Sequence, residues 1–205
     1  MHAVRLLLFL LMVPWVVATA ATTEGEMEMA RALVQNRCSL CHGMHGESVS
    51  NQYPKLASQH AEYLVKQLFN FKTGQRPSTV MQKMTDDLTA GEIGMLARYF
   101  AEQPLSADTV EDPELAVVGR YLYFRGNRWS SVSACVLCHG VYATGGAQMP
   151  RLAGQRASYI EGRLREAMRP DRRDMLAAMH SAIAGLTELE IKAVSQYLSG
   201  EVDAQ

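Results

Sequence analysis

Two Cys-x-x-Cys-His motifs constrain this chain more than any other feature. They are CSLCH at Cys38–His42 and CVLCH at Cys135–His139. In such a motif each thiol can form a thioether with one vinyl group of a porphyrin, and the adjacent histidine then lies beneath the iron as an axial ligand. The spacing therefore predicts two covalently attached c-type haems, with four attachment residues: Cys38, Cys41, Cys135 and Cys138.

Three other uses of four cysteines remain open. One shared zinc ion would require both halves of the chain to fold around it, because the usual zinc patterns separate the two cysteine pairs by roughly 15–20 residues. A thioredoxin-like redox motif explains Cys-x-x-Cys but not a histidine directly after both copies. Structural disulfides are compatible with an even number of cysteines in a secreted chain. Haem attachment also explains the two histidines, and it is therefore favoured.

The N-terminal segment has the pattern of a secretory signal peptide over residues 1–20. Arg5 precedes an apolar run, and Ala18-Thr19-Ala20 supplies the small residues of a cleavage site. The run contains Pro14 and is short for a membrane span. We therefore expect export, with an uncleaved N-terminal anchor as the alternative.

Composition indicates an ordinary globular protein. The chain has 205 residues, of which 48% are hydrophobic, and a formal net charge of −1. The sequence contains neither a basic stripe nor an aromatic platform of the kind that nucleic-acid-binding proteins use. No nucleic-acid partner is expected.

The chain contains an internal repeat. The segment Tyr53–Leu68 (YPKLASQHAEYLVKQL) aligns with Met149–Leu164 (MPRLAGQRASYIEGRL), and the two haem motifs lie at matching places ahead of these segments. Within the aligned segments the matched pairs include Pro54 with Pro150, Gln59 with Gln155, and Tyr63 with Tyr159. A repeat of this length indicates a duplicated domain rather than a solenoid.

The repeat predicts two domains, at residues 22–103 and 114–205. Between them, residues 104–113 are polar and acidic and are bounded by Pro104 and Pro113. Such a composition favours an extended, solvated linker. Each domain is small for a self-sufficient core, and a covalently bound haem would supply part of the missing apolar interior.

Each half is predicted to be helical. Helices are expected over residues 27–37, 58–72, 114–124 and 155–168. Two more follow the capping boxes that begin at Thr89 and Thr187, where a glutamate three residues later completes the motif. An apolar stripe at helical spacing follows the first box, and a similar one follows the second: Ile93, Leu96, Ala97 and Phe100, then Ile191, Val194 and Leu198. No strand pattern is present, so the predicted class is all-α.

His42 and His139 leave the opposite face of each iron without a ligand. A methionine thioether there raises the reduction potential, whereas an open position would permit substrate chemistry. Met81 stands as many residues before Leu88 as Met179 does before Leu186. The repeat therefore predicts Met81 and Met179 as the sixth ligands, in a loop ahead of the last helix of each half.

Other candidates for the sixth ligand remain. Met84 and Met175 lack a methionine at the equivalent position of the other half. Three histidines, His45, His60 and His180, could also bind iron, and His180 lies directly beside Met179. Methionines also commonly fill irregular cores without any further role.

Taken together, these motifs resemble those of the dihaem cytochrome c4 family. The resemblance rests on both Cys-x-x-Cys-His-Gly motifs, the paired Pro-Lys-Leu-Ala and Pro-Arg-Leu-Ala segments, the stretch Gln67–Gly74, and both methionine-to-Leu-Thr spacings. It implies two tandem class I cytochrome c domains, each wrapped around one haem, in a protein exported to the periplasm. It further implies that His42 with Met81, and His139 with Met179, bind the irons. The carbonyls of Pro54 and Pro150 would accept hydrogen bonds from the histidines.

The resemblance implies an electron carrier rather than an enzyme. Two six-coordinate haems would leave no site for a small-molecule substrate, which disfavours a dihaem peroxidase. The expected partners are periplasmic redox proteins, such as a membrane oxidase or a quinol-oxidising complex, and peripheral membrane association is compatible with them. The alternative is a c4-like cytochrome subunit of a periplasmic dehydrogenase complex such as flavocytochrome c sulfide dehydrogenase.

Overall fold

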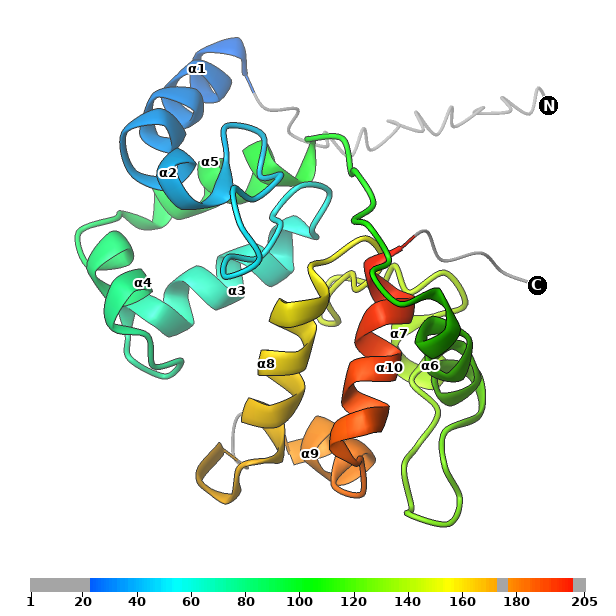
Figure 1. Cartoon of the computed structure of the whole chain (residues 1–205). Coiled ribbons are helices and arrows are strands. Elements are labelled where there is room, and N and C mark those ends of the chain that lie inside the picture. The colour runs from blue at the N-terminus through cyan, green and yellow to red at the C-terminus, as the bar shows by residue number, and fades with distance from the viewer. Residues whose placement is uncertain (1–22, 173–176, 201–205) are drawn as a thin grey trace, which may run out of the picture.

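The structure is a computed structural model that describes residues 23–172 and 177–200. The predicted signal peptide lies outside these residues. Within the described ranges the regular elements are helices, and the two β-bridges, Asn127 with Val132 and Gly146 with Met149, are isolated. The predicted all-α class is confirmed (Figure 1).

The first half begins with one helical segment that changes its winding. Helix α1 (Glu24–Leu33) continues through a π-helical turn, η1 (Val34–Cys38), into the short α2 (Ser39–His42). A π turn inside a helix is often found at a functional site, and this one delivers the first cysteine of the motif. The half is completed by three further helices: α3 (Ala61–Lys72), α4 (Thr79–Thr85) and α5 (Ala90–Ala101).

The second half repeats this order of helices. It contains α6 (Pro113–Arg125), α7 (Val136–His139), α8 (Ala157–Met168), a 3-10 turn η2 (Pro170–Arg172), α9 (Ala177–Ile183) and α10 (Glu188–Ser199). Figure 1 shows the two halves as two helical units, with α3 of the first facing α8 of the second.

Both predicted capping boxes are present at the starts of α5 and α10. The hydroxyl of Thr89 accepts from the Glu92 N–H at 3.2 Å, and the Glu92 carboxylate accepts from the Thr89 N–H at 2.8 Å. Thr187 and Glu190 make the same pair of bonds. These bonds satisfy backbone groups that would otherwise lack partners at a helix start.

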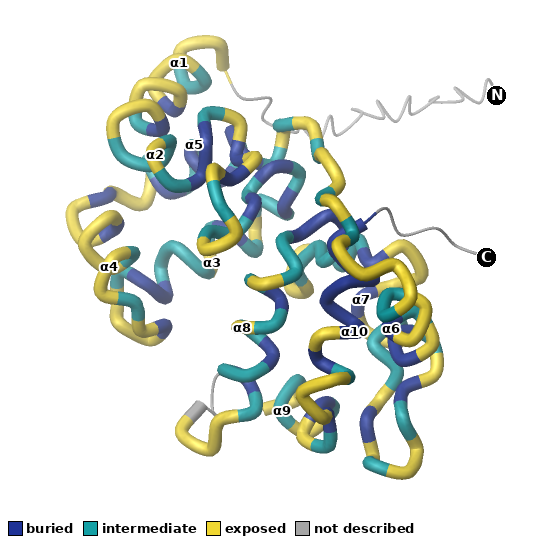
Figure 2. Tube along the Cα trace, in the orientation of Figure 1, coloured by how far each residue is buried: buried dark blue, intermediate teal, exposed yellow. Residues whose placement is uncertain are grey.

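The apolar stripes of α5 and α10 form the centres of two separate cores. The predicted residues on α5 are buried among α1 and α3, and those on α10 among α6 and α8. Figure 2 shows buried residues along both helices. The expected inward faces of the two helices are confirmed.

A glycine permits a close helix crossing in the second half. Gly119 on α6 lies against the backbone of Ala193 on α10, and a Cβ at this position would overlap the Ala193 carbonyl oxygen. Only a residue without a side chain fits there without displacing one helix. The first helix of the second half is thereby held against the last one.

The segment between the halves is extended, but it is not simply solvated. Its Asp108 backbone N–H donates to the Ser199 carbonyl at 2.8 Å, and its Asp108 carboxylate accepts from Arg156 at 2.7 Å. Lys55 of the first half donates to the Ser106 carbonyl at 2.7 Å. The polar composition of residues 104–113 predicted a solvated segment, because composition does not reveal hydrogen-bond partners elsewhere in the chain. The segment therefore helps to fasten the two halves together.

Candidate haem-binding sites

Each motif histidine is buried at the end of a short helix. His42 closes α2 with 7% of its surface exposed, and His139 closes α7 with 5% exposed. The Nδ1 of His42 lies 3.0 Å from the carbonyl oxygen of Pro54. In the second half, His139 Nδ1 lies 3.2 Å from the carbonyl oxygen of Pro150. Both hydrogen bonds that the resemblance implied are therefore present.

These hydrogen bonds decide which ring nitrogen is available. A carbonyl oxygen only accepts, so the proton of a neutral imidazole resides on Nδ1 and the lone pair on Nε2. Burial lowers the pKa of His42 and of His139, and the bond to the proline carbonyl offsets part of that effect. Each histidine is therefore neutral at pH 7 and can donate its Nε2 lone pair to a metal.

The four motif cysteines are free thiols, and no disulfide joins them. Burial raises the pKa of Cys38 and of Cys135 to about 11, so both thiols are protonated at neutral pH. A redox-active dithiol needs a lowered thiol pKa instead. Across residues 23–172 and 177–200, no three His, Cys, Asp or Glu side chains converge as a zinc site requires. The raised thiol pKa values do not favour a redox dithiol, and the placement of these side chains does not favour a zinc site.

The loop after each histidine has the same backbone path in both halves. Ser48 N–H donates to the His42 carbonyl at 2.8 Å, and Gly145 N–H donates to the His139 carbonyl at 2.9 Å. Left-handed residues recur at matching places, in the pairs Gly43 and Gly140, Gly46 and Ala143, Ser48 and Gly145, and Ser58 and Gly154. This shared path returns the chain so that the proline carbonyl meets the histidine.

Met81 and Met179 occupy equivalent places in the fold. Each is the third residue of a short helix, α4 or α9. The expectation of a loop at these positions is wrong. In α4 the Ser78 hydroxyl accepts from the Met81 N–H at 3.2 Å and caps the helix. Both methionine side chains are partly buried, and Met179 packs against the second core.

The rival ligands differ in how they are placed. Met84 is exposed, and Met175 lies outside the described residues. His60 uses its Nε2 to bond the Thr144 carbonyl of the other half at 2.6 Å, so this nitrogen is already engaged. His45 and His180 use only Nδ1, toward Gln103 and the Ala167 carbonyl respectively, and so remain rivals to the methionines.

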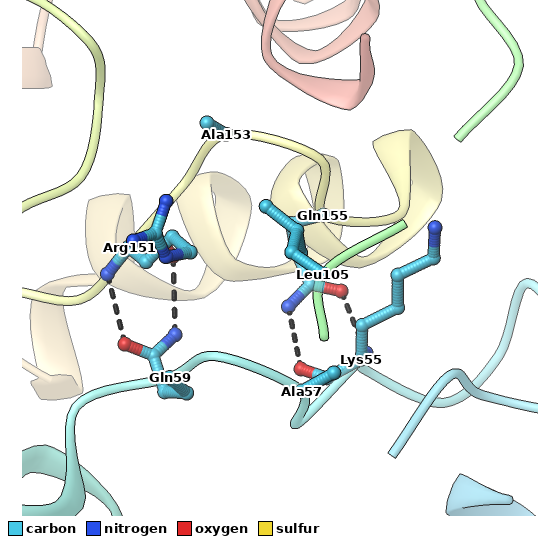
Figure 3. A pocket seen from close by; sticks show the side chains of 7 residues that line it. All are labelled: Lys55, Ala57, Gln59, Leu105, Arg151, Ala153 and Gln155. Atoms are coloured by element: carbon cyan, nitrogen blue, oxygen red, sulfur yellow. Dashed lines mark hydrogen bonds between the residues drawn. The ribbon is translucent and has the colours of Figure 1, made fainter. Parts of the chain in front are cut away.

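Two glutamines, for which the sequence predicted no role, form hydrogen bonds to the backbone of the opposite half. The Gln59 side chain accepts from the Arg151 N–H at 2.8 Å and donates to the Arg151 carbonyl at 3.1 Å. Gln155 makes the same two bonds to the backbone of Lys55, at 2.8 and 2.9 Å (Figure 3). Both glutamines are buried. Their match within the repeat was the only signal in the sequence, and it indicated no partner.

Further hydrogen bonds join the same two faces. The Arg151 side chain donates to the Ser58 carbonyl at 2.9 Å, and Arg156 donates to the Ser48 carbonyl at 3.0 Å. Both accepting carbonyls lie in the segment that follows His42, and both arginines lie in the segment that follows His139, so the interface and the two histidine sites are built from the same segments.

Each half supplies what a covalently attached haem requires. It offers two cysteines at the spacing of a haem-attachment motif and a methionine at a position that the repeat conserves. It also offers a neutral histidine whose Nδ1 bonds the proline carbonyl, which leaves Nε2 available. In the described ranges, no helix is both long enough and apolar enough to span a membrane.

Comparison with known proteins gives the same assignment. The family model for cytochrome c matches residues 27–112. The cytochrome c4 of Thiocapsa roseopersicina is 42% identical over 187 residues, covering 88% of this chain and 95% of the relative. The thiosulfate dehydrogenase electron acceptor of Thiomonas intermedia (strain K12) is 34% identical over 80% of this chain and 78% of its own length.

The solved structures extend the likeness to the whole fold. The crystal structure of reduced recombinant cytochrome c4 from Pseudomonas stutzeri matches with a TM-score of 0.74 at 32% identity, covering 85% of this chain and 98% of that one. Relatives that are more than 30% identical and span most of both chains establish the family of a protein. They support a c-type cytochrome that takes part in electron transfer and binds haem c covalently. The chain belongs to the cytochrome c4 family.

Proposed function

We propose that this protein is a dihaem electron carrier of the periplasm. Cys38 and Cys41 would hold one haem, and Cys135 and Cys138 the other. His42 with Met81, and His139 with Met179, would be the axial ligands. One observation carries the proposal: a buried histidine bonded through Nδ1 to a proline carbonyl occurs in both halves.

Bound haem supplies a one-electron couple between Fe(II) and Fe(III). The chain's own residues set the conditions for that couple. The proline carbonyls fix the plane of each imidazole and raise its basicity as a ligand. Met81 and Met179 would supply a thioether as the second protein ligand of each iron, which would raise the potential and leave substrate no position to occupy. We therefore infer electron transfer without catalysis.

The proposed partners are other redox proteins. A donor such as a quinol-oxidising complex and an acceptor such as a terminal oxidase suit a carrier with two closed centres. The second candidate is a cytochrome subunit of a dehydrogenase complex. It is supported by the relative from Thiomonas intermedia, which is named as the electron acceptor of thiosulfate dehydrogenase.

A redox titration of the purified holoprotein, combined with its haem content, tests the carrier proposal. We expect two haems per chain, one electron for each, and the Met-to-iron(III) charge-transfer band from both. A single haem, or a haem without that band, would contradict the proposed ligand set. N-terminal sequencing of the mature protein tests the signal peptide, for which we expect a new terminus after Ala20.

Gel filtration of the native protein distinguishes the two candidates. A free carrier elutes at the size of one chain with no stoichiometric partner. Co-elution with a flavoprotein or another dehydrogenase subunit would instead favour the complex. Reconstituted electron transfer from that subunit would then establish the direction of flow.

A further inference from the structure

One peptide group links the first motif histidine to the other half of the protein. The carbonyl oxygen of Pro54 lies 3.0 Å from His42 Nδ1 and accepts its hydrogen bond. The N–H of the same peptide group belongs to Lys55, and it donates to the Gln155 side-chain oxygen at 2.8 Å. Histidine, peptide and glutamine therefore form one continuous chain of hydrogen bonds.

The second half contains the mirror arrangement. The Pro150 carbonyl accepts from His139 Nδ1 at 3.2 Å. The N–H of that peptide group belongs to Arg151, and it donates to the Gln59 side-chain oxygen at 2.8 Å. Each histidine is thus connected, through one peptide group, to a glutamine of the opposite half.

Hydrogen bonds in such a chain strengthen one another. An acceptor on a peptide N–H draws charge through the amide, which makes the carbonyl oxygen of the same group a better acceptor. A better acceptor at Nδ1 makes the imidazole a more basic ligand. A more basic ligand favours Fe(III) over Fe(II) and so lowers the reduction potential.

The setting makes this polarisation effective. Gln59 and Gln155 have only 6% and 7% of their surface exposed, and Lys55 has 5%. Water therefore competes little for the glutamine amides and for the Lys55 N–H, and electrostatic effects are stronger in such surroundings. Each glutamine also donates to the carbonyl of the residue whose N–H it accepts, which fixes the orientation of its amide.

We propose that Gln59 and Gln155 are positioning residues that tune the haem of the opposite half. Gln155 lowers the potential of the haem bound by His42, and Gln59 lowers that of the haem bound by His139. The proposal rests on the histidine ligation inferred above. It goes further in assigning a crossed dependence, in which each redox centre is adjusted by a residue of the other domain.

The test replaces each glutamine in the holoprotein. Gln155→Met keeps the approximate length and volume of the side chain but removes the acceptor, and Gln59→Met is its mirror. Gln155→Asn is a milder variant that retracts the amide and keeps the test open if the methionine variant does not fold. Ser158→Ala is the control, because it deletes another bond between the halves, to the Asn51 carbonyl, without touching either peptide group.

The readout is the potential of each haem, followed separately through the paramagnetically shifted methyl resonances of the haem itself. We expect Gln155→Met to shift the first haem to a more positive potential and to leave the second unchanged. Gln59→Met should give the reverse. Gln155→Asn should shift the first haem in the same direction by less, and Ser158→Ala should shift neither.

Three results would overturn the proposal: equal shifts of both haems in each variant, a shift confined to the glutamine's own half, or no shift at all. The wild-type protein tests the underlying function separately. If its spectra show fewer than two histidine-ligated haems, the proposed function fails before any variant is made. If both haems are present and the crossed pattern is absent, only the tuning proposal fails.

Discussion

The Arg76 guanidinium donates a 2.9 Å hydrogen bond to the hydroxyl of Tyr159, across the boundary between the two halves. Arg76 is 7% exposed, it also donates to the Gln67 side chain at 2.7 Å, and its guanidinium carbon lies 4.5 Å from the centre of the Phe71 ring. A buried cation needs good partners for all its donors. The second half of the protein supplies one of them.

Replacing Tyr159 by phenylalanine should destabilise the holoprotein. The change leaves one guanidinium N–H of Arg76 without its partner, at a cost of about 1–3 kcal/mol in the free energy of unfolding. Urea unfolding measures the loss. Tyr121→Phe on the exposed face of α6 is the control, for which we expect no measurable change. Equal stability of the Tyr159 variant and the wild type would contradict this account of the interface.

Gly119→Ala and Gly162→Ala should change stability in opposite directions. The added methyl group at position 119 meets the Ala193 carbonyl, and overpacking of this kind costs about 1–3 kcal/mol. The added methyl group at position 162 in α8 meets nothing within 4 Å, so the better helix propensity of alanine should contribute about 1 kcal/mol. Thermal unfolding of both variants checks the signs, and a stabilised Gly119 variant would disprove the close crossing.

The capping box of α5 predicts a dependence of stability on pH. The Glu92 carboxylate accepts hydrogen bonds from the backbone N–H and the hydroxyl of Thr89. Both bonds lower the pKa of that carboxyl, the backbone bond more strongly. The stabilisation is therefore complete above the unfolded value of about 4.3 and is lost as the pH falls through the lowered folded pKa. Glu92→Gln keeps the acceptor oxygen but cannot titrate. Urea unfolding between neutral and acidic pH should show a smaller loss for this variant, and an unchanged loss would refute the assignment.

Met81→His should lower the potential of one haem and leave the other nearly unchanged. Imidazole is a stronger donor to Fe(III) than a thioether, so the oxidised state gains stability. A redox titration with loss of the charge-transfer band from one haem measures the effect. Met84→His is the matched control on the same helix and should change neither haem. If only the Met84 variant shifted a potential, the ligand assignment in the first half would be wrong.

Much of the fold was predictable because its signals are local. Thr89 and Glu92 lie three residues apart, and Ile93 begins a stripe on a single helix face, so neighbouring residues alone define the start and orientation of α5. The motif located His42 in the same way. Its role as an iron ligand stays a prediction, as do those of Met81 and Met179.

The remainder depends on contacts that no local pattern encodes. Ser48, Ser58 and Ala143 adopt the left-handed backbone region that favours glycine, because the loop path imposes it. Asp108 was expected in a solvated linker because its ion-pair partner, Arg156, is distant in sequence. The repeat showed that Gln59 and Gln155 correspond, but only the packed structure shows that each reaches the backbone of the other half.

The reciprocal glutamine contacts have the pattern of a two-fold homodimer, in which residue i of one subunit binds residue j of the other and the reverse also holds. Such an interface needs no difference between its partners, so a single ancestral domain could have made it with its own copy. Association of separate copies depends on concentration. Joining the copies in one chain converts the pairing into an intramolecular event that dilution cannot reverse.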